Sequence, residues 1–358
     1  MISRRIAAVS LAAALSTTML AGCATNEAGD LPSDLSGTID GSGSSAQGAA
    51  QEVWVAGFQR NNAFVTVNYD PVGSGAGRQA FLGGGTDFAG SDSPLSDEEL
   101  ESEFPSCVPG GGAIDLPLYV SPIAIAYRVE GVSNLRLDGE TLARIFRGDI
   151  ARWDDPALVA LNPGAPLPNA PITAVHRSDD SGTTKNFTEY LAAVAGDAWG
   201  AEADDTFPFP VGESALGNSG VVEAVASGRN TIGYADASKV GDLDVASILV
   251  GDQFVAPSAQ GAAIAADLSP RIPGRAEHDI ALEIDRTTTA AGAYPLVLVS
   301  YVITCQEYRD ADTGELVAAF LAHIVSPAGQ AAAEKSAGSA PLAPGLLADV
   351  EAAIASIR

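Results

Sequence analysis

The chain has 358 residues, of which 46% are hydrophobic and 18% are charged, so it can hold two ordinary domains and is not a largely disordered protein. Its formal net charge of −26 argues against a nucleic-acid-binding protein, which needs a basic face. The net charge does not exclude a small buried site for an anion, because a few local hydrogen-bond donors decide the affinity of such a site.

Residues 1–22 have the features of a secretory signal peptide. A positively charged start precedes an apolar run from residue 6 to residue 20, which is too short for a membrane-spanning helix. The run ends in Leu20-Ala21-Gly22-Cys23, which resembles a bacterial lipobox. That resemblance implies cleavage before Cys23 and attachment of a lipid anchor to its sulfur, on the outer face of the cell membrane. The alternative is a plain secretory signal with an incidental cysteine.

Two further cysteines, Cys107 and Cys305, remain in the chain. In an exported protein such a pair is expected to form a disulfide rather than a metal site. Three histidines without close spacing also argue against zinc. The sequence therefore predicts one disulfide, no metal and no cofactor.

Residues 23–36 are small, polar and acidic, and are interpreted as a flexible tether. After them, alternating or continuous apolar runs predict strands at residues 65–69, 118–129, 172–176 and 296–304. Amphipathic spacing predicts helices at residues 46–58, 78–82, 140–147, 181–194, 315–324 and 346–357, and Ser96 with Glu99 forms a capping-box pattern. Strands that alternate with helices indicate an α/β fold.

The stretch His176–Thr184, HRSDDSGTT, is the densest polar cluster in the chain. Asp180-Ser181-Gly182-Thr183 has the Asp-Ser-Gly-Thr pattern of an aspartic protease, for which Asp312-Thr313-Gly314 would supply the second carboxylate. The polar residues before both motifs and the helix–strand alternation argue against that enzyme.

The other hypothesis for this stretch is an anion site. The start of a helix exposes unpaired N–H groups, Gly182 allows close approach to the backbone, and Ser181 and Thr183 add hydroxyls. Arg177 offers a planar guanidinium that Asp179 can orient. An ordinary helix cap with a surface salt bridge is the alternative explanation.

Two more glycine-serine loops precede expected helices, at Gly41–Ser45 and Gly73–Gly77. Three such helix starts in one α/β chain suggest an anion site built from helix ends. Asp92, in the stretch Phe88–Leu95, does not obviously belong in such a site, and taken alone it is a turn aspartate before Pro94.

These motifs, together with Trp153–Pro156, Gly217–Gly220 and Thr231–Tyr234, resemble in order the phosphate-binding protein of the bacterial high-affinity phosphate ABC transporter. The resemblance covers nearly the whole mature chain and implies a two-lobed periplasmic-binding-protein-like fold of type II, with a ligand cleft between lobes joined by a hinge. Lobe I is expected to hold residues 37–125 and 298–358, and lobe II residues 126–297.

The resemblance also implies a set of phosphate ligands and a second residue that orients one of them. The expected ligands are Ser45, the backbone of Ala46, Ser74, Asp92, Arg177, Ser181, Gly182 and Thr183, and Asp179 is expected to orient Arg177. The family commonly has Thr-Phe where this chain has Ser45-Ala46, a change that keeps a hydroxyl and a backbone N–H.

The implied function is extracytoplasmic binding of inorganic phosphate and its delivery to a membrane permease with an ATPase subunit. The chain itself has no GxxxxGK[ST] loop, so ATP hydrolysis must lie elsewhere. Two alternatives remain: a binding protein for another oxyanion or an organic phosphate, and a secreted hydrolase. The hydrolase lacks a base placed near a nucleophile, so the protein is not expected to be an enzyme.

Overall fold

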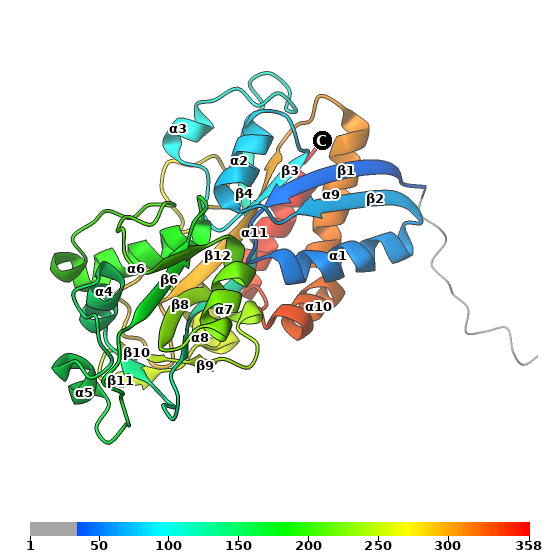
Figure 1. The fold of residues 1–358 in the computed structure, drawn as a ribbon. Coiled ribbons are helices and arrows are strands. Elements are labelled where there is room, and N and C mark those ends of the chain that lie inside the picture. Colours follow the sequence, from blue (N-terminus) through cyan, green and yellow to red (C-terminus); the bar gives the residue numbers. More distant parts are fainter. Residues whose placement is uncertain (1–33) are drawn as a thin grey trace, which may run out of the picture. The chain divides into compact units, whose positions relative to one another are not determined.

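A nine-stranded mixed sheet runs through the computed structural model, which describes residues 34–358 (Figure 1). Its strands follow the order β2 (Phe64–Asp70), β1 (Ser36–Gly43), β3 (Phe88–Ser91), β12 (Val297–Cys305), β4 (Ala113–Arg128), β8 (Thr231–Asp236), β6 (Thr173–Arg177) and β7 (Glu213–Ala215), and β9 (Asp244–Val245) pairs with β4. A second sheet has three strands, β11 (Gln253–Val255), β10 (Ser247–Val250) and β5 (Arg136–Leu137).

The long strand β4 connects the two halves of the large sheet. Its residues 113–122 pair antiparallel with β12, and its residues 123–128 pair antiparallel with β8. On the β12 side, β1 lies parallel to both β2 and β3. On the β8 side, β6 lies parallel to β8 and β7. Each half therefore has three parallel strands, β2-β1-β3 in one and β8-β6-β7 in the other, and the antiparallel strands β12 and β4 join them.

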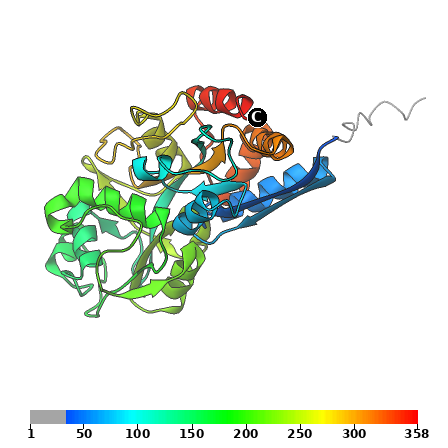
Figure 2. The same ribbon diagram turned by 90° about the horizontal axis from the view of Figure 1, so that it is seen from above.

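Helices cover both halves of the sheet. Those packed on the β1 side are α1 (Gly48–Asn61), α2 (Ser74–Leu82), α9 (Ala311–Val325), α10 (Pro327–Ala337) and α11 (Pro344–Ala355), whereas α4 (Gly139–Arg147), α6 (Gly182–Trp199) and α7 (Gly217–Ser227) pack on the β8 side. Figures 1 and 2 both show these groups apart, with the green helices on one side and the blue, orange and red ones on the other. The other helices are α3 (Asp97–Leu100), α5 (Pro156–Leu161), α8 (Ala259–Asp267) and the 3₁₀ turn Ala237–Lys239.

The local sequence signals explain where several helices begin. Ser96 and Glu99 form the expected capping box at the start of α3, with Glu99 N donating to Ser96 Oγ at 3.2 Å and Ser96 N donating to Glu99 Oε2 at 2.8 Å. Asp138 Oδ1 caps α4 by accepting from Thr141 N at 2.7 Å, and Gly148 ends that helix with φ 90°. These side chains satisfy backbone groups that a helix end leaves unpaired.

The structure differs from the sequence expectation at two glycine-serine stretches. The first three residues of the expected loop Gly41–Ser45 end strand β1, and helix α2 begins at Ser74, inside the expected loop Gly73–Gly77. Strand β1, SGTIDGSG, has few β-branched residues and no apolar alternation, so its pairing with β2 and β3 decides its conformation.

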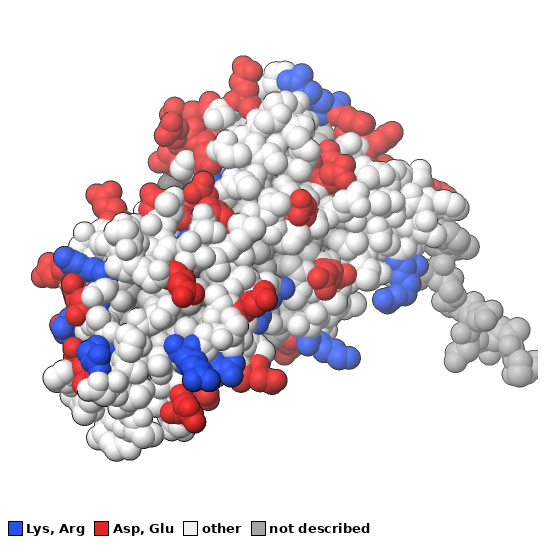
Figure 3. Space-filling model, viewed as in Figure 1, with Lys and Arg blue, Asp and Glu red and all other residues white. Residues whose placement is uncertain are grey.

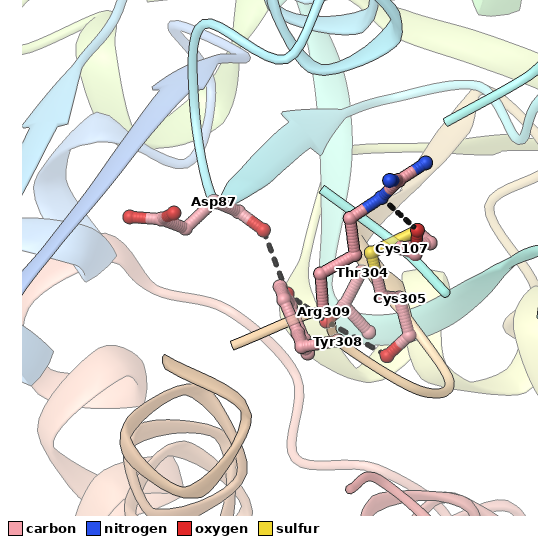
Figure 4. Close-up of a disulfide and its surroundings, with 6 residues drawn as sticks. All are labelled: Asp87, Cys107, Thr304, Cys305, Tyr308 and Arg309. Carbon is pink, nitrogen blue, oxygen red and sulfur yellow. Dashed lines mark hydrogen bonds between the residues drawn. A yellow bond between two sulfur atoms is a disulfide. The ribbon is translucent and has the colours of Figure 1, made fainter. Parts of the chain in front are cut away.

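A disulfide joins Cys107 and Cys305, as the cysteine count predicted, across 198 residues with a Cα–Cα distance of 5.3 Å (Figure 4). It fixes the end of β12 to the loop that follows α3. Tyr308 and Arg309 add to this anchor: Tyr308 Oη donates to Asp87 O at 2.6 Å, and Arg309 Nε donates to Cys107 O at 2.8 Å. Both cysteines lie in segments expected to form lobe I.

Leu35–Arg358 form one compact unit, so the residue limits of the two lobes stay a prediction. Helix α8, from the segment expected in lobe II, packs against β4 and β12. Of residues 34–358, no single helix has the length and apolar composition to cross a bilayer; the bent pair α9 and α10 passes on those criteria alone. On the face drawn in Figure 3, Lys and Arg are scattered among acidic side chains and do not gather in one basic patch.

Candidate functional site

Asp92 lies at the centre of a buried group of hydroxyls. It directly follows β3 and is only 3% exposed. Ser300 Oγ donates to Asp92 Oδ1 at 2.6 Å, Ser44 Oγ donates to the same oxygen, and Thr183 Oγ1 donates to Oδ2 at 2.9 Å. Because β1, β3 and β12 are neighbours in the sheet, side chains that are distant in the sequence meet at this carboxylate.

Arg177 ends β6 beside this group and is held by Asp179. Its Nε donates to Asp179 Oδ1 at 2.7 Å, its Nη2 donates to Asp179 Oδ2, and its Nη1 lies 3.4 Å from Thr183 Oγ1. Burial alone would raise the pKa of Asp179, but the hydrogen bonds and charge of Arg177 hold it below its ordinary value. This bidentate pairing holds the buried guanidinium beside the hydroxyl of Thr183.

Helix α6 begins against Asp92. Ser181 is the N-cap, and its Oγ accepts from Thr184 N at 3.1 Å, which leaves its own hydrogen available for an anion. A Cβ on Gly182 would lie 2.7 Å from both Asp92 Cβ and Ser74 Oγ. Glycine is therefore required for the start of α6 to approach the Asp92 loop so closely.

The remaining expected ligands border the same group. Ser74, the first residue of α2, accepts from Asp92 N through its Oγ at 3.1 Å. Ser45 Oγ accepts from Asn218 N at 3.2 Å and from Asn218 Nδ2 at 3.0 Å. Ala46 N donates to Ser44 Oγ at 3.1 Å, so this backbone N–H already has a partner in the structure.

Two carboxylates shape the electrostatics of the site. Burial raises the pKa of Asp92, while the hydrogen bonds from its three hydroxyl partners and the charge of Arg177 act in the opposite direction. Burial also raises the pKa of Asp236, which ends β8, to about 6. Asp236 N donates to Asn218 Oδ1 at 2.8 Å, so Asn218 connects this second acid to the group around Asp92.

Three residues of this site were not predicted as ligands or partners. Ser44 lies in the first glycine-serine loop, where the family resemblance indicates its neighbour Ser45. Ser300 is the lone serine of the apolar run LVLVSYVIT, which is the one sequence sign that it has a polar partner. Asn218 stands in the Gly-Asn-Ser-Gly stretch and had no role assigned. Cys23, the expected lipid anchor, lies outside the described residues.

The residues of the protease hypothesis have other partners. Asp180 Oδ1 accepts from Thr206 Oγ1 at 2.9 Å, and Asp312 lies in the first turn of α9, where its N–H donates to Asp310 Oδ1. The ring of His176 stacks on Phe207 with the ring centroids 4.1 Å apart. None of these contacts pairs two carboxylates or places a base beside a nucleophile.

Comparison with known proteins agrees with this architecture. A family model described as the PBP superfamily domain matches residues 28–328. "Phosphate-binding protein PstS 2" of Mycobacterium tuberculosis is 39% identical over 373 residues, with 99% of each chain covered. "Phosphate-binding protein PstS 3" of Mycobacterium leprae is 41% identical over 297 residues, covering 79% of this chain and 78% of the relative.

Solved structures give the same class of fold. A high-affinity periplasmic phosphate-binding protein, PfluDING, solved with bound phosphate, matches with a TM-score of 0.70 and 25% identity, covering 88% of this chain and 93% of that one. The fold is therefore that of a two-lobed periplasmic binding protein. Within that class, the chain belongs to the PstS family of phosphate-binding proteins.

Proposed function

We propose that this protein binds inorganic phosphate outside the cytoplasm and delivers it to the permease of a phosphate ABC transporter. The observation that carries the proposal is the group around Asp92, where a buried carboxylate, an oriented guanidinium and the start of α6 lie together. The names of the relatives and of the phosphate-bound structural neighbour agree with it.

The proposed ligands are those expected from the motifs: Ser45, Ala46, Ser74, Asp92, Arg177, Ser181, Gly182 and Thr183. The N-terminus of α6 and Arg177 balance the charge of the anion. The hydroxyls of Ser45, Ser74 and Ser181 and backbone N–H groups, among them that of Thr183, donate to its oxygens. Asp179 keeps Arg177 in place.

Asp92 gives this site its preference for phosphate. An ionised carboxylate only accepts hydrogen bonds, and phosphate near neutral pH still carries a proton that it can donate. Sulfate carries none, so it would place lone pairs and negative charge against Asp92 in a buried site. The same residue thus serves one oxyanion and penalises the other.

The remaining parts of the proposal concern the setting of the protein. Cleavage before Cys23 and lipidation of its sulfur would hold the receptor at the outer face of the membrane. The partners are the permease and ATPase subunits of the transporter. The receptor binds phosphate and releases it unchanged, without catalysis.

Calorimetric titration of the chain that starts after Cys23, stripped of bound phosphate, tests the function. We expect one phosphate per molecule and no displacement by excess sulfate. Absence of phosphate binding, or displacement by sulfate, would contradict the proposal and redirect the search to other oxyanions and to organic phosphates.

A further inference from the structure

The hydrogens around Asp92 have fixed directions, and this is clearest at Ser300. Gln47 Nε2 donates to Ser300 Oγ at 2.7 Å and to Tyr301 O at 2.8 Å. A backbone carbonyl only accepts hydrogen bonds, so the amide nitrogen of Gln47, not its oxygen, faces Ser300. Gln51 Nε2 donates to Gln47 Oε1 at 2.9 Å and holds the amide in that orientation.

Because Gln47 Nε2 has no lone pair to offer, the single hydrogen of Ser300 must go elsewhere. Asp92 Oδ1, at 2.6 Å, is the near acceptor, and Ser91 O lies farther away at 3.4 Å. Ser300 is therefore a donor to Asp92, and Gln47 fixes it in that role. Gln47 and Ser300 are both fully buried, so water does not compete for these bonds.

The other two hydroxyls are constrained in the same way. Ser44 Oγ accepts from the backbone N–H groups of Ala46 at 3.1 Å and Gln47 at 3.3 Å, which leaves its hydrogen for Asp92. Thr183 Oγ1 accepts from Arg177 Nη1 at 3.4 Å and Asn218 Nδ2 at 3.3 Å. All three hydroxyls thus point hydrogens at Asp92.

The pairing of β12 with β3 places Ser300 beside Asp92, because Tyr301 lies opposite Ser91 in this antiparallel pair. The pairing of β12 with β4 shifts register between Ser300 and Tyr301, opposite Tyr119 and Pro117. The extra residue of this bulge, Leu118, belongs to β4, the neighbour of β12, and bulges are common beside functional sites.

We propose that Ser300, held by Gln47, is a positioning residue that locks Asp92 as a hydrogen-bond acceptor and so sets the preference of the site for a protonated oxyanion. The inference rests on the proposed phosphate-binding function. Hydrogen-bond donors around Asp92 favour its ionised form, and an ionised Asp92 cannot donate to a fully deprotonated anion such as sulfate. Loss of one donor favours the protonated carboxyl, which no longer repels sulfate.

The test compares the wild-type protein with Ser300→Ala, Ser300→Thr and Gln47→Leu by titration with phosphate and sulfate at a series of pH values. For Ser300→Ala we expect the phosphate-over-sulfate affinity ratio to fall on the order of tenfold or more, the range for a hydrogen bond to a charged group. Sulfate binding should begin at a higher pH than in the wild type. Ser300→Thr keeps the hydroxyl and should restore both properties, and Gln47→Leu should shift them in the direction of Ser300→Ala.

The pH profile separates this role from a merely structural one. The charged and titratable groups that face Asp92 from other strands are Arg177 on β6, Asp236 on β8 and Tyr69 on β2, and they are the same in all variants. A difference in the affinity ratio between two variants at one pH therefore reports the lost hydrogen bond, because the protonation of free phosphate is the same for both variants.

Thr304→Val is the matched control, since Thr304 is a fully buried hydroxyl on the same strand that bonds Tyr308 instead of Asp92. The phosphate-over-sulfate ratio and the pH profile of Thr304→Val should equal those of the wild type. The inference is overturned if Ser300→Ala keeps the wild-type phosphate-over-sulfate ratio and pH profile. If Ser300→Ala does not fold, the same result for Gln47→Leu overturns it. A wild-type protein that does not bind phosphate would overturn the proposed function instead.

Discussion

A carboxylate beside an anion is unfavourable unless the anion brings a hydrogen that the carboxylate can accept. In the proposed site, phosphate brings such a hydrogen to Asp92 and sulfate does not, and the burial of Asp92 increases the difference because water cannot screen it. At the residue scale, selectivity therefore depends on which groups around Asp92 donate hydrogens.

Replacing Asp92 by Asn tests this directly, because the amide keeps the shape and supplies a donor. The phosphate-over-sulfate ratio should fall by roughly 10- to 100-fold, as expected for a hydrogen bond to a charged group. Competition titration measures the ratio. Asp180→Asn is the control. Asp180 accepts a hydrogen bond from Thr206 and does not belong to the group around Asp92, so this variant should keep the wild-type phosphate-over-sulfate ratio. A full wild-type ratio in Asp92→Asn would remove Asp92 from this role.

Gly182 gives a second prediction at this scale. An alanine Cβ would meet Asp92 Cβ and Ser74 Oγ at 2.7 Å, so Gly182→Ala should force α6 away from the Asp92 loop and weaken phosphate binding by at least about tenfold, as for misplaced binding groups. Gly196 belongs to the same helix, and a Cβ there meets nothing within 4 Å. Gly196→Ala should bind as the wild type does. Equal affinity of both variants would show that the close approach is not needed.

At the scale of elements, sequence signals predict the helices that have a capping residue at their start and an apolar face with helical spacing. The capping box at Ser96 and the cap at Ser181 are both confirmed, and the long apolar strands β4 and β12 lie where their hydrophobic runs predict. The sequence does not predict strand β1, because its residues do not favour a strand and its pairing with β2 and β3 stabilises it.

The sequence likewise predicts only those residues of the candidate site that stand in motifs. Asp92, Arg177 and Thr183 stand in recognisable motifs, and the structure brings them together. Ser300 lies 208 residues from Asp92 and stands in no motif. Its meeting with Asp92 depends on the pairing of β12 with β3, which short-range sequence patterns do not encode.

The disulfide between Cys107 and Cys305 stabilises the end of β12 without contacting the group around Asp92. Replacing both cysteines by serine should lower the free energy of unfolding by at most about 5 kcal/mol, the chain-entropy estimate for a loop of this length. Phosphate affinity should stay the same. Denaturant unfolding and calorimetry measure the two quantities; a large loss of affinity in a folded double variant would mean that the disulfide also shapes the site.

At the scale of the whole molecule, an ion pair joins the segments expected to form different lobes. Arg78 on α2 pairs with Asp205, in the loop after α6, and also with Glu99 at 2.9 Å. The Asp205 carbonyl accepts from Ser181 N at 3.0 Å, so this loop also supports the start of α6. The pair is mostly buried, with side-chain exposures of 11% and 19%, so water screens it only in part.

Asp205→Asn should therefore favour opening of the cleft and speed phosphate release by a factor of about three to ten, because a partly buried ion pair contributes on the order of 1 kcal/mol. Stopped-flow measurement of dissociation tests this. The control is Asp149→Asn, which removes the more exposed pair with Arg147 inside the segment expected to form lobe II and should leave the rate unchanged. Equal rates in both variants would mean that the Arg78–Asp205 pair does not hold the lobes together.

The crystal structure of the phosphate complex tests the central claim most directly. The account predicts one phosphate in the group formed by Asp92, Arg177 and the first turn of α6. One phosphate oxygen should lie within hydrogen-bond distance of Asp92, and others should accept from Arg177 and from the N–H groups of Gly182 and Thr183. Phosphate bound at another place, or with no oxygen in contact with Asp92, would contradict the account.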